Sequence, residues 1–218
     1  MTNRFLLVFF LLAGVLSCPA QVQVSKEPMH HNVFENDRVR VLDVHIPPGD
    51  TSLMHKHSTP SVFIVLTNTK TGSQVIVEPG KLRLTEGNIW FEGFYDKPRI
   101  HRVWNNDTSE FHVIDMELLN KNPQPVDPPL ELKSLTLLFD EKPVRGYRFT
   151  LTAQSTLLLP RRKAPIVVVA LTNAVGNTTA NNKPLTKKGD YIFVEPGSSI
   201  NFINSGNAGQ DFAIFELK

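Results

Sequence analysis

The chain has very little cysteine and very little net charge. Cys18 is its one cysteine among 218 residues, so an intramolecular disulfide is excluded. The 23 lysines and arginines are scattered among 21 acidic residues, which excludes the basic footprint of a nucleic-acid-binding protein. The sequence also lacks a phosphate-binding loop, a nucleophile with its base and a paired-carboxylate site. The enzyme classes built on those features are therefore disfavoured.

Long apolar runs are absent beyond residue 16. Arg4 precedes the apolar run 5–16, which is shorter than the ~20 residues that a membrane-spanning helix needs. We therefore interpret residues 1–20 as an export signal. Two cleavage chemistries fit its end: Ser17-Cys18 resembles a bacterial lipobox that would lipidate Cys18, whereas Ala20 fits ordinary signal peptidase. The mature protein would be periplasmic, extracellular or held at a membrane by that lipid alone.

The sequence also lacks long stretches in which apolar residues recur with the spacing of a helix. Sixteen prolines and twelve glycines separate short runs rich in Val, Ile, Leu, Phe and Thr, which predicts an all-β fold. In the first such run, Leu42, Val44 and Ile46 alternate on one face that we expect to be buried. Further strands are predicted over 62–67, 74–77, 81–85, 88–92, 100–104 and 111–118. Their spacing is typical of a sandwich or barrel.

The chain contains an internal repeat. Residues 122–129 hold four prolines and are interpreted as part of a linker, 121–132, between a unit over 28–120 and a second over 133–218. At a constant offset of 105, Phe34 falls on Phe139 and Leu66-Thr67-Asn68 falls on Leu171-Thr172-Asn173. Shorter offsets then place Gly87 on Gly189 and Glu117 on Glu216. A duplicated β unit is the simplest explanation.

The second unit has no histidine. All seven histidines precede residue 113, and two of them, His55 and His57, follow the Gly49 turn two positions apart, so both rings leave the same face of a strand. That spacing suits two ligands of one metal ion, with His101 as the third. The repeat places Pro160, Arg162 and Ile200 at the three corresponding positions. Because the fold recurs without these histidines, we expect His55, His57 and His101 to serve function.

Two motifs resemble those of the cupin superfamily. They are Gly49-x5-His55-x-His57 and Gly87…His101-x3-Asn105. The resemblance implies two tandem jelly-roll β-barrels, a bicupin whose second barrel is degenerate, with a metal held inside the first by the three histidines. Ser61 and Val62 stand where the family usually has a glutamate ligand. The loop 92–98 is longer than usual, and we expect it to shape the entrance of the site.

Three imidazoles without a carboxylate leave coordination positions open for substrate. The ligand type admits Fe, Mn, Ni, Cu or Zn alike. The resemblance implies an oxidoreductase of the non-haem iron dioxygenase type, acting on a small organic molecule. The alternative is a non-catalytic cupin that binds a sugar or an aromatic acid. Phe63 and Ser61 are the expected substrate-binding residues, and Glu92 is a candidate carboxylate ligand or base.

The remaining histidines, basic residues and tryptophans are expected to lie at the surface, in a loop or at the interface between the barrels. His45 and His112 are expected on the outside of the barrel, and the pair His30-His31 in solvent. The basic run 161–163 is expected to form a solvated loop. Trp90 and Trp104 are predicted to lie at the interface between the barrels. Exposed sheet edges make a homodimer compatible with the sequence.

Overall fold

A computed structural model describes residues 21–75 and 79–218. The predicted export signal, with Cys18, lies outside the described residues. Within them the chain is all-β except for one turn of 3₁₀ helix, Val24–Lys26, which confirms the predicted fold class. No helix in the described part of the chain has the length and apolarity needed to cross a membrane.

The first half of the chain folds into two five-stranded sheets that face each other. Hydrogen-bonded neighbours in the first sheet are, in order, β1 (Val22–Gln23), β4 (His55–His57), β9 (Arg99–Asn105), β6 (Thr69–Val75) and β7 (Pro79–Leu84). The second sheet has the order β2 (His30–Glu35), β3 (Val39–Ile46), β10 (Phe111–Leu118), β5 (Ser61–Val65) and β8 (Ile89–Glu92). The chain therefore enters this barrel at Val22, before the predicted boundary at residue 28.

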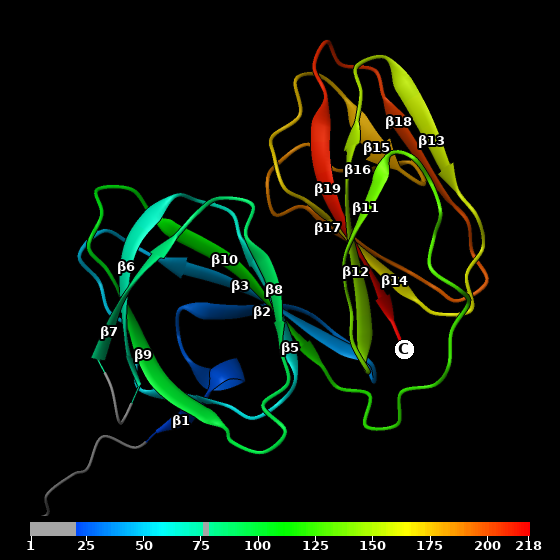
Figure 1. Ribbon diagram of the computed structural model, residues 1–218. Coiled ribbons are helices and arrows are strands. Elements are labelled where there is room, and N and C mark those ends of the chain that lie inside the picture. Colours follow the sequence, from blue (N-terminus) through cyan, green and yellow to red (C-terminus); the bar gives the residue numbers. More distant parts are fainter. Residues whose placement is uncertain (1–20, 76–78) are drawn as a thin grey trace, which may run out of the picture.

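The second half repeats this arrangement beside the first (Figure 1). One sheet has the order β11 (Leu135–Asp140), β12 (Val144–Leu151), β19 (Gln210–Leu217), β14 (Ile166–Ala170) and β17 (Tyr191–Val194). The other has the order β13 (Ser155–Leu159), β18 (Ile200–Asn204), β15 (Thr178–Ala180) and β16 (Lys183–Pro184). Strands β2, β3 and β5 match β11, β12 and β14 at the sequence offset of 105. The strand bounds thus follow the repeat that the sequence indicates.

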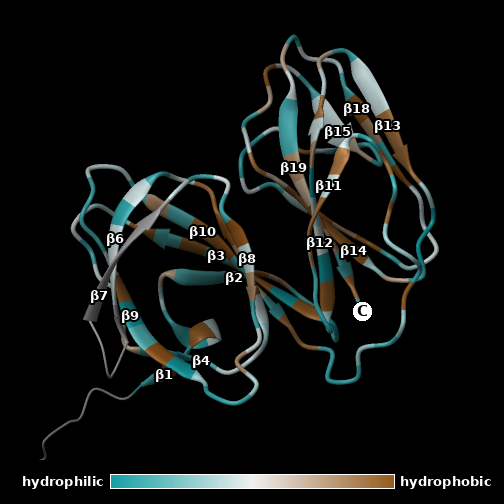
Figure 2. Cartoon of the chain, viewed as in Figure 1, coloured by the Kyte–Doolittle hydropathy of each residue, from teal (hydrophilic) through white to brown (hydrophobic). Residues whose placement is uncertain are grey.

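Alternation along the strands builds three apolar clusters. Leu42, Val44 and Ile46 point into the first barrel, as predicted, and Phe149 and Phe202 belong to the cluster that fills the second. Side chains on the opposite face of the same strands form the third cluster, which joins the two barrels. Figure 2 shows hydrophobic residues gathered in the strands, with hydrophilic residues in many of the connecting loops.

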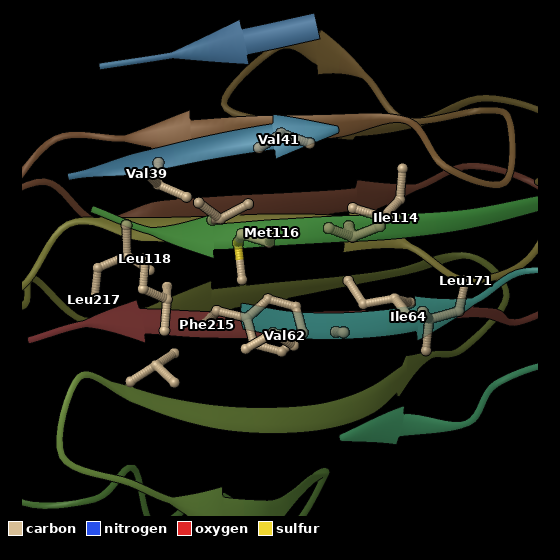
Figure 3. Packing of buried hydrophobic residues seen from close by; sticks show 14 of the residues in the cluster. Val39, Val41, Val62, Ile64, Ile114, Met116, Leu118, Leu171, Phe215 and Leu217 are labelled. Atoms are coloured by element: carbon tan, nitrogen blue, oxygen red, sulfur yellow. The ribbon is translucent and has the colours of Figure 1, made fainter. Parts of the chain in front are cut away.

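The third cluster fixes how the barrels pack. Val41, Ile64 and Met116 of the first barrel meet Phe215 and Leu217 of the second, and all five are almost completely buried (Figure 3). Burial of an aliphatic or aromatic side chain stabilises a fold by about 1.5–3 kcal/mol. A cluster shared in this way should make the two barrels one folding unit.

The two barrels contact each other reciprocally. The Phe34 ring of β2 lies 5.3 Å from the Phe193 ring of β17, and the matching pair, Phe139 of β11 and Phe91 of β8, lies 6.4 Å apart. Lys188 and Glu86, which occupy equivalent positions in the two repeats, form an ion pair of 2.8 Å. The barrels therefore pack about an approximate two-fold axis.

The predicted place of the two tryptophans is wrong. The Trp90 ring stacks on Phe63 inside the first barrel, with centroids 5.1 Å apart, while its neighbours Ile89 and Phe91 pack toward the second barrel. Trp104 lies across Gly72, where an added Cβ would come within 2.0 Å of the indole. Residues 89–91 are apolar on both faces of β8, so alternation alone did not reveal which face looks inward.

Candidate metal centre

Strands β4 and β9 bring the three predicted ligands together. His55 is directly opposite His101 in this antiparallel pair, and His57 lies two residues further along the same face of β4. His57 Nε2 is 3.1 Å from His55 Nε2 and 3.0 Å from His101 Nε2. The three Nε2 atoms therefore converge on one point.

The other nitrogen of each ring also faces a polar group. His55 Nδ1 lies 2.8 Å from the Leu53 carbonyl oxygen, to which it donates a proton, and this leaves a lone pair on Nε2. His101 Nδ1 is within hydrogen-bond distance, 2.9 Å, of the Ser73 hydroxyl. His57 Nδ1 lies 3.4 Å from a carboxylate oxygen of Asp115. Such outer partners orient metal-binding imidazoles and fix their tautomers.

The arrangement fits a divalent transition metal. Ligand nitrogens at bond lengths of about 2.1 Å and right angles stand about 3.0 Å apart, which matches the observed separations. Burial and the neighbouring histidines lower the pKa of His55 to about 3 and that of His101 to about 2. Both imidazoles are therefore neutral at pH 7, the form that binds metal. Three ligands on one side leave the cavity side open.

Asp115 is the residue of this site that the sequence reasoning missed. It lies on β10 opposite Phe63, is 1% exposed, and its carboxylate has no hydrogen-bond partner among the described residues. A buried carboxylate without a partner is costly unless a cation is near. One signal was available, because the repeat that pairs Glu117 with Glu216 also places Ile214 at the position of Asp115.

The N-terminal arm reaches the site, which corrects the prediction for His30. His31 is exposed as expected, but His30 is only 9% exposed and its ring is 4.8 Å from that of His55. Glu27 holds it there, since its carboxylate lies 2.5 Å from His30 Nδ1 and also accepts the Leu53 amide proton. Burial acts to raise the pKa of Glu27, but these hydrogen bonds hold it below its usual value.

A cavity of about 880 Å³ opens from the metal centre. Its wall is mainly apolar, with the stacked pair of Phe63 and Trp90 on one side, so Phe63 lies where the sequence places it. Leu138 and Arg148 of the second barrel also line it. The second barrel thus contributes to the wall of the cavity in the first.

Of the other two predicted site residues, Ser61 and Glu92, only Glu92 lines the cavity. Ser61 is fully buried, its hydroxyl donates to the Thr59 carbonyl at 3.2 Å, and it is not among the residues that line the cavity. Glu92 does line the cavity, at the end of β8, where it forms an ion pair with Arg99. That pairing directs the Glu92 carboxylate toward the guanidinium.

The loop 92–98, which we expect to shape the entrance of the site, contacts the metal centre through Phe94. Phe94 has a left-handed backbone with φ of 50°, and its buried ring stacks on His57 with centroids 5.4 Å apart. The Arg99 guanidinium lies 5.5 Å from the centre of the same ring. Phe94 therefore closes the metal centre on the side of His57.

In the second barrel, the position equivalent to His57 belongs to a group of ion pairs instead of a metal centre. Arg162, at the position equivalent to His57, is 9% exposed and bonds to Glu216, which Arg145 also contacts at 2.9 Å. The predicted solvated loop over 161–163 is therefore wrong for its central residue. Tyr147, Phe149 and Phe202 fill the interior beside it. This barrel is packed where the first has its cavity.

Comparisons with known proteins support the cupin fold. No protein-family model matches the sequence, and no curated protein matches it. Among solved structures, YhhW from Escherichia coli aligns with a TM-score of 0.60 at 12% identity, over 88% of this chain and 89% of that one. Salicylate 1,2-dioxygenase from Pseudoaminobacter salicylatoxidans, with gentisate, gives 0.58 at 12% identity, over 84% and 70%. A cupin domain from Bordetella pertussis is 21% identical over 45% of this chain and 96% of its own, with a TM-score of 0.39. The two longer alignments span both halves of the chain, which has the cupin fold.

Proposed function

We propose that this chain is an exported metalloprotein that binds one divalent transition metal through His55, His57 and His101. We propose further that it is an oxidoreductase of the dioxygenase type for a small organic substrate. One observation carries the proposal: His57 Nε2 stands 3.1 Å from His55 Nε2 and 3.0 Å from His101 Nε2 beside a cavity, and the other nitrogen of each ring faces a polar group. A packing role would not require three imidazoles to aim at one point.

The chain's own residues prepare the site for chemistry. A bound ion would supply Lewis-acid chemistry and, if it were iron, redox chemistry. The Leu53 carbonyl and Ser73 hold the His55 and His101 rings, and Asp115 lies behind the His57 ring, so little reorganisation is needed when the ion binds. The mainly apolar wall gives the cavity a lining of low polarity, which strengthens electrostatic interactions beside it.

The cavity suits a flat, partly apolar molecule. Phe63 and Trp90 offer stacked aromatic surface, and Arg99, which also pairs with Glu92, offers a cation in the same cavity. A salicylate dioxygenase of the same fold holds gentisate, which is an aromatic acid. These points support an aromatic acid as the substrate class, with the ring against the aromatic wall and the carboxylate near Arg99.

One observation favours the alternative of a binding protein without catalysis. Glu92, the candidate base, is engaged by Arg99 in an ion pair. That ion pair occupies the Glu92 carboxylate, which is therefore less available to contact a bound substrate. The same cavity could then bind a sugar or an aromatic acid with the metal as an anchor.

Metal content tests the site itself. The mature chain, purified without a histidine tag and dialysed against metal-free buffer, should retain about one transition metal per molecule. His57→Ala should lose it, and His31→Ala, which changes an exposed histidine, should keep it. A metal content in the His57 variant equal to that of the wild type would refute the proposed centre.

Oxygen uptake then separates an enzyme from a binding protein. Fe(II)-loaded protein would be offered aromatic acids, catechols, diketones, flavonols and thiols, with His57→Ala as the inactive control. Uptake that depends on one substrate class supports the oxidoreductase. Silence across the panel, together with tight ligand binding measured by calorimetry, would favour the binding protein.

Export is tested by the mature N-terminus. Mass spectrometry of protein expressed in a bacterial host should show cleavage either before Cys18, with a lipid on its thiol, or after Ala20. Full-length chain retained in the cytoplasm would contradict the export proposal and leave the metal centre untouched.

A further inference from the structure

A second group of metal-ligating side chains lies on the outer face of the first barrel. Asp43 and His45 are on β3, and His112 is directly opposite His45 on β10. Both histidines reach the same carboxylate: His112 Nε2 lies 2.7 Å from Asp43 Oδ1, and His45 Nε2 lies 3.1 Å from Asp43 Oδ2. One ligand atom from each residue lies within 4.8 Å of the other two. Both histidines lie on the outside of the barrel, as the sequence predicts, and their convergence on one carboxylate is visible only in the structure.

The two rings are held in position. They stack with centroids 4.2 Å apart and planes inclined by 21°. The Nδ1 of His45 lies 3.1 Å from a carboxylate oxygen of Glu110, so a second carboxylate supports this ring from behind. Carboxylates in that position are common partners of metal-bound histidines. The two carboxylates also make the site attractive to a cation.

The site is sheltered by the second barrel yet open to solvent. The turn 187–190 packs over it, and Gly189, with φ of 90°, would place a Cβ 3.0 Å from His112 Cε1 if it carried one. The side chains of Asp43 and His45 remain 30% exposed and line a cavity of about 1030 Å³ between the barrels. An ion could therefore reach the three side chains without unfolding.

The repeat shows that the fold does not need imidazoles there. In the second barrel Arg148, Thr150 and Asp211 occupy the positions equivalent to Asp43, His45 and His112. Arg148 and Thr150 both bond to the Asp211 carboxylate, at 2.7 Å and 2.6 Å. The polar requirement of this surface is thus met without ligating nitrogens. This is the second place where the first barrel has histidines and its twin does not.

We propose that Asp43, His45 and His112 bind a second divalent transition metal at the junction of the two barrels. Two imidazoles and one carboxylate suit ions such as Zn²⁺, Ni²⁺ or Cu²⁺ better than Ca²⁺ or Mg²⁺. The nitrogen–oxygen separations of 2.7 Å and 3.1 Å are close to the ~3.0 Å between adjacent ligands of such an ion. The ion would replace the two contacts to Asp43 with only small shifts of the side chains.

Calorimetric titration of the full mature chain with Zn²⁺ tests this site separately from the first. The measurement is made on the wild type and on His57→Ala, each with and without the triple change D43R/H45T/H112D. The triple change installs the trio of the second barrel, so it keeps a polar network while removing the ligands. The expected result is one equivalent of Zn²⁺, bound with micromolar affinity, that disappears with the triple change in both backgrounds.

Two further measurements keep the test decisive. Thermal unfolding shows whether the triple variant is folded; if it is not, H45Q/H112Q takes its place, because glutamine can still hydrogen-bond to Asp43. NMR signals of the His45 and His112 rings should shift with the same equivalent of Zn²⁺. Unchanged Zn²⁺ binding after loss of both imidazoles would overturn the proposal, as would ring signals that do not respond. Either result would leave these residues as a hydrogen-bonded surface cluster.

Discussion

A carboxylate oxygen of Asp115 lies 3.4 Å from Nδ1 of His57 inside the first barrel, and neither atom has a hydrogen bond among the described residues. The pair is almost completely buried, with 3% and 1% of the two side chains exposed. A carboxylate behind a metal-binding histidine raises the basicity of that ligand and fixes its orientation. The same carboxylate, without the ion, is a buried charge that destabilises the fold.

Asp115→Asn should therefore change two properties in opposite directions. Metal affinity should fall about 10- to 100-fold, because His57 loses its charged partner. The metal-free protein should melt at a higher temperature, because a buried charge has been removed. Competition with a chromophoric chelator measures the affinity, and calorimetric melting of the metal-free form measures the stability. A change that lowered both would identify Asp115 as a structural residue only.

The strands were predictable from the sequence because one face of most of them is apolar. Leu42, Val44 and Ile46 alternate clearly with polar residues, and the equivalent residues of the second repeat show the same alternation. The metal ligands were predictable for a different reason: His55 and His57 have a diagnostic spacing, and their repeat partners cannot bind metal. Both kinds of pattern are local in the sequence or repeated at a fixed offset.

The features that were missed depend on contacts between distant segments. Asp115 is one of two carboxylates in β10, and its role is visible only through its distance to His57 on another strand. His30 is buried because Glu27 accepts the amide proton of Leu53, 26 residues away. The three-residue apolar run around Trp90 has no preferred face until the second barrel covers Ile89 and Phe91.

The backbone at Phe94 leads to a prediction that separates conformation from side-chain size. A residue with φ of 50° is strained unless it is glycine, by about 1–2 kcal/mol. Phe94→Gly should therefore be more stable than Phe94→Ala by about 1 kcal/mol, although it removes more side chain. Urea unfolding of the metal-free proteins measures the difference. Equal stability of the two variants would contradict a left-handed backbone at this position.

The same two variants test the contact between Phe94 and the metal centre. Both remove the ring that stacks on His57. Metal should therefore dissociate faster from either variant than from the wild type, and by similar factors. Tyr95→Ala, which changes the neighbouring exposed side chain, is the matched control and should leave the dissociation rate unchanged.

The shared apolar cluster predicts that the two barrels unfold together. Phe215 belongs to the second barrel and is fully buried against the first, so Phe215→Ala should destabilise the chain by about 3–5 kcal/mol. Both tryptophans lie in the first barrel, so their fluorescence reports on that barrel alone. The fluorescence transition in urea should nevertheless shift to lower concentration. Leu158→Ala, which changes a side chain that is 64% exposed, should not shift it.

A transition that stayed in place for Phe215→Ala would show that the barrels unfold independently. Circular dichroism, which reports on both barrels, would then resolve two steps where the fluorescence shows one. Coincident curves from the two probes are the expected result.

The Glu35 carboxylate provides a test of stability against pH. Two hydrogen bonds of 2.8 Å from the Arg40 guanidinium, with one from Asn32, lower the pKa of Glu35 from 4.5 to about 2. A carboxyl group whose pKa is lower in the folded state contributes stability above its unfolded pKa and loses it as the pH falls through its folded pKa. The contribution should therefore be complete above about pH 5 and decline as the pH falls from 4.5 through 2. Because the group is exposed, the difference between wild type and Glu35→Gln should be modest at neutral pH and smaller still at pH 2 in urea unfolding of the metal-free proteins. Glu131→Gln, at another exposed carboxylate, controls for the general loss of charge, and a Glu35→Gln difference that stayed constant across this range would contradict the low pKa.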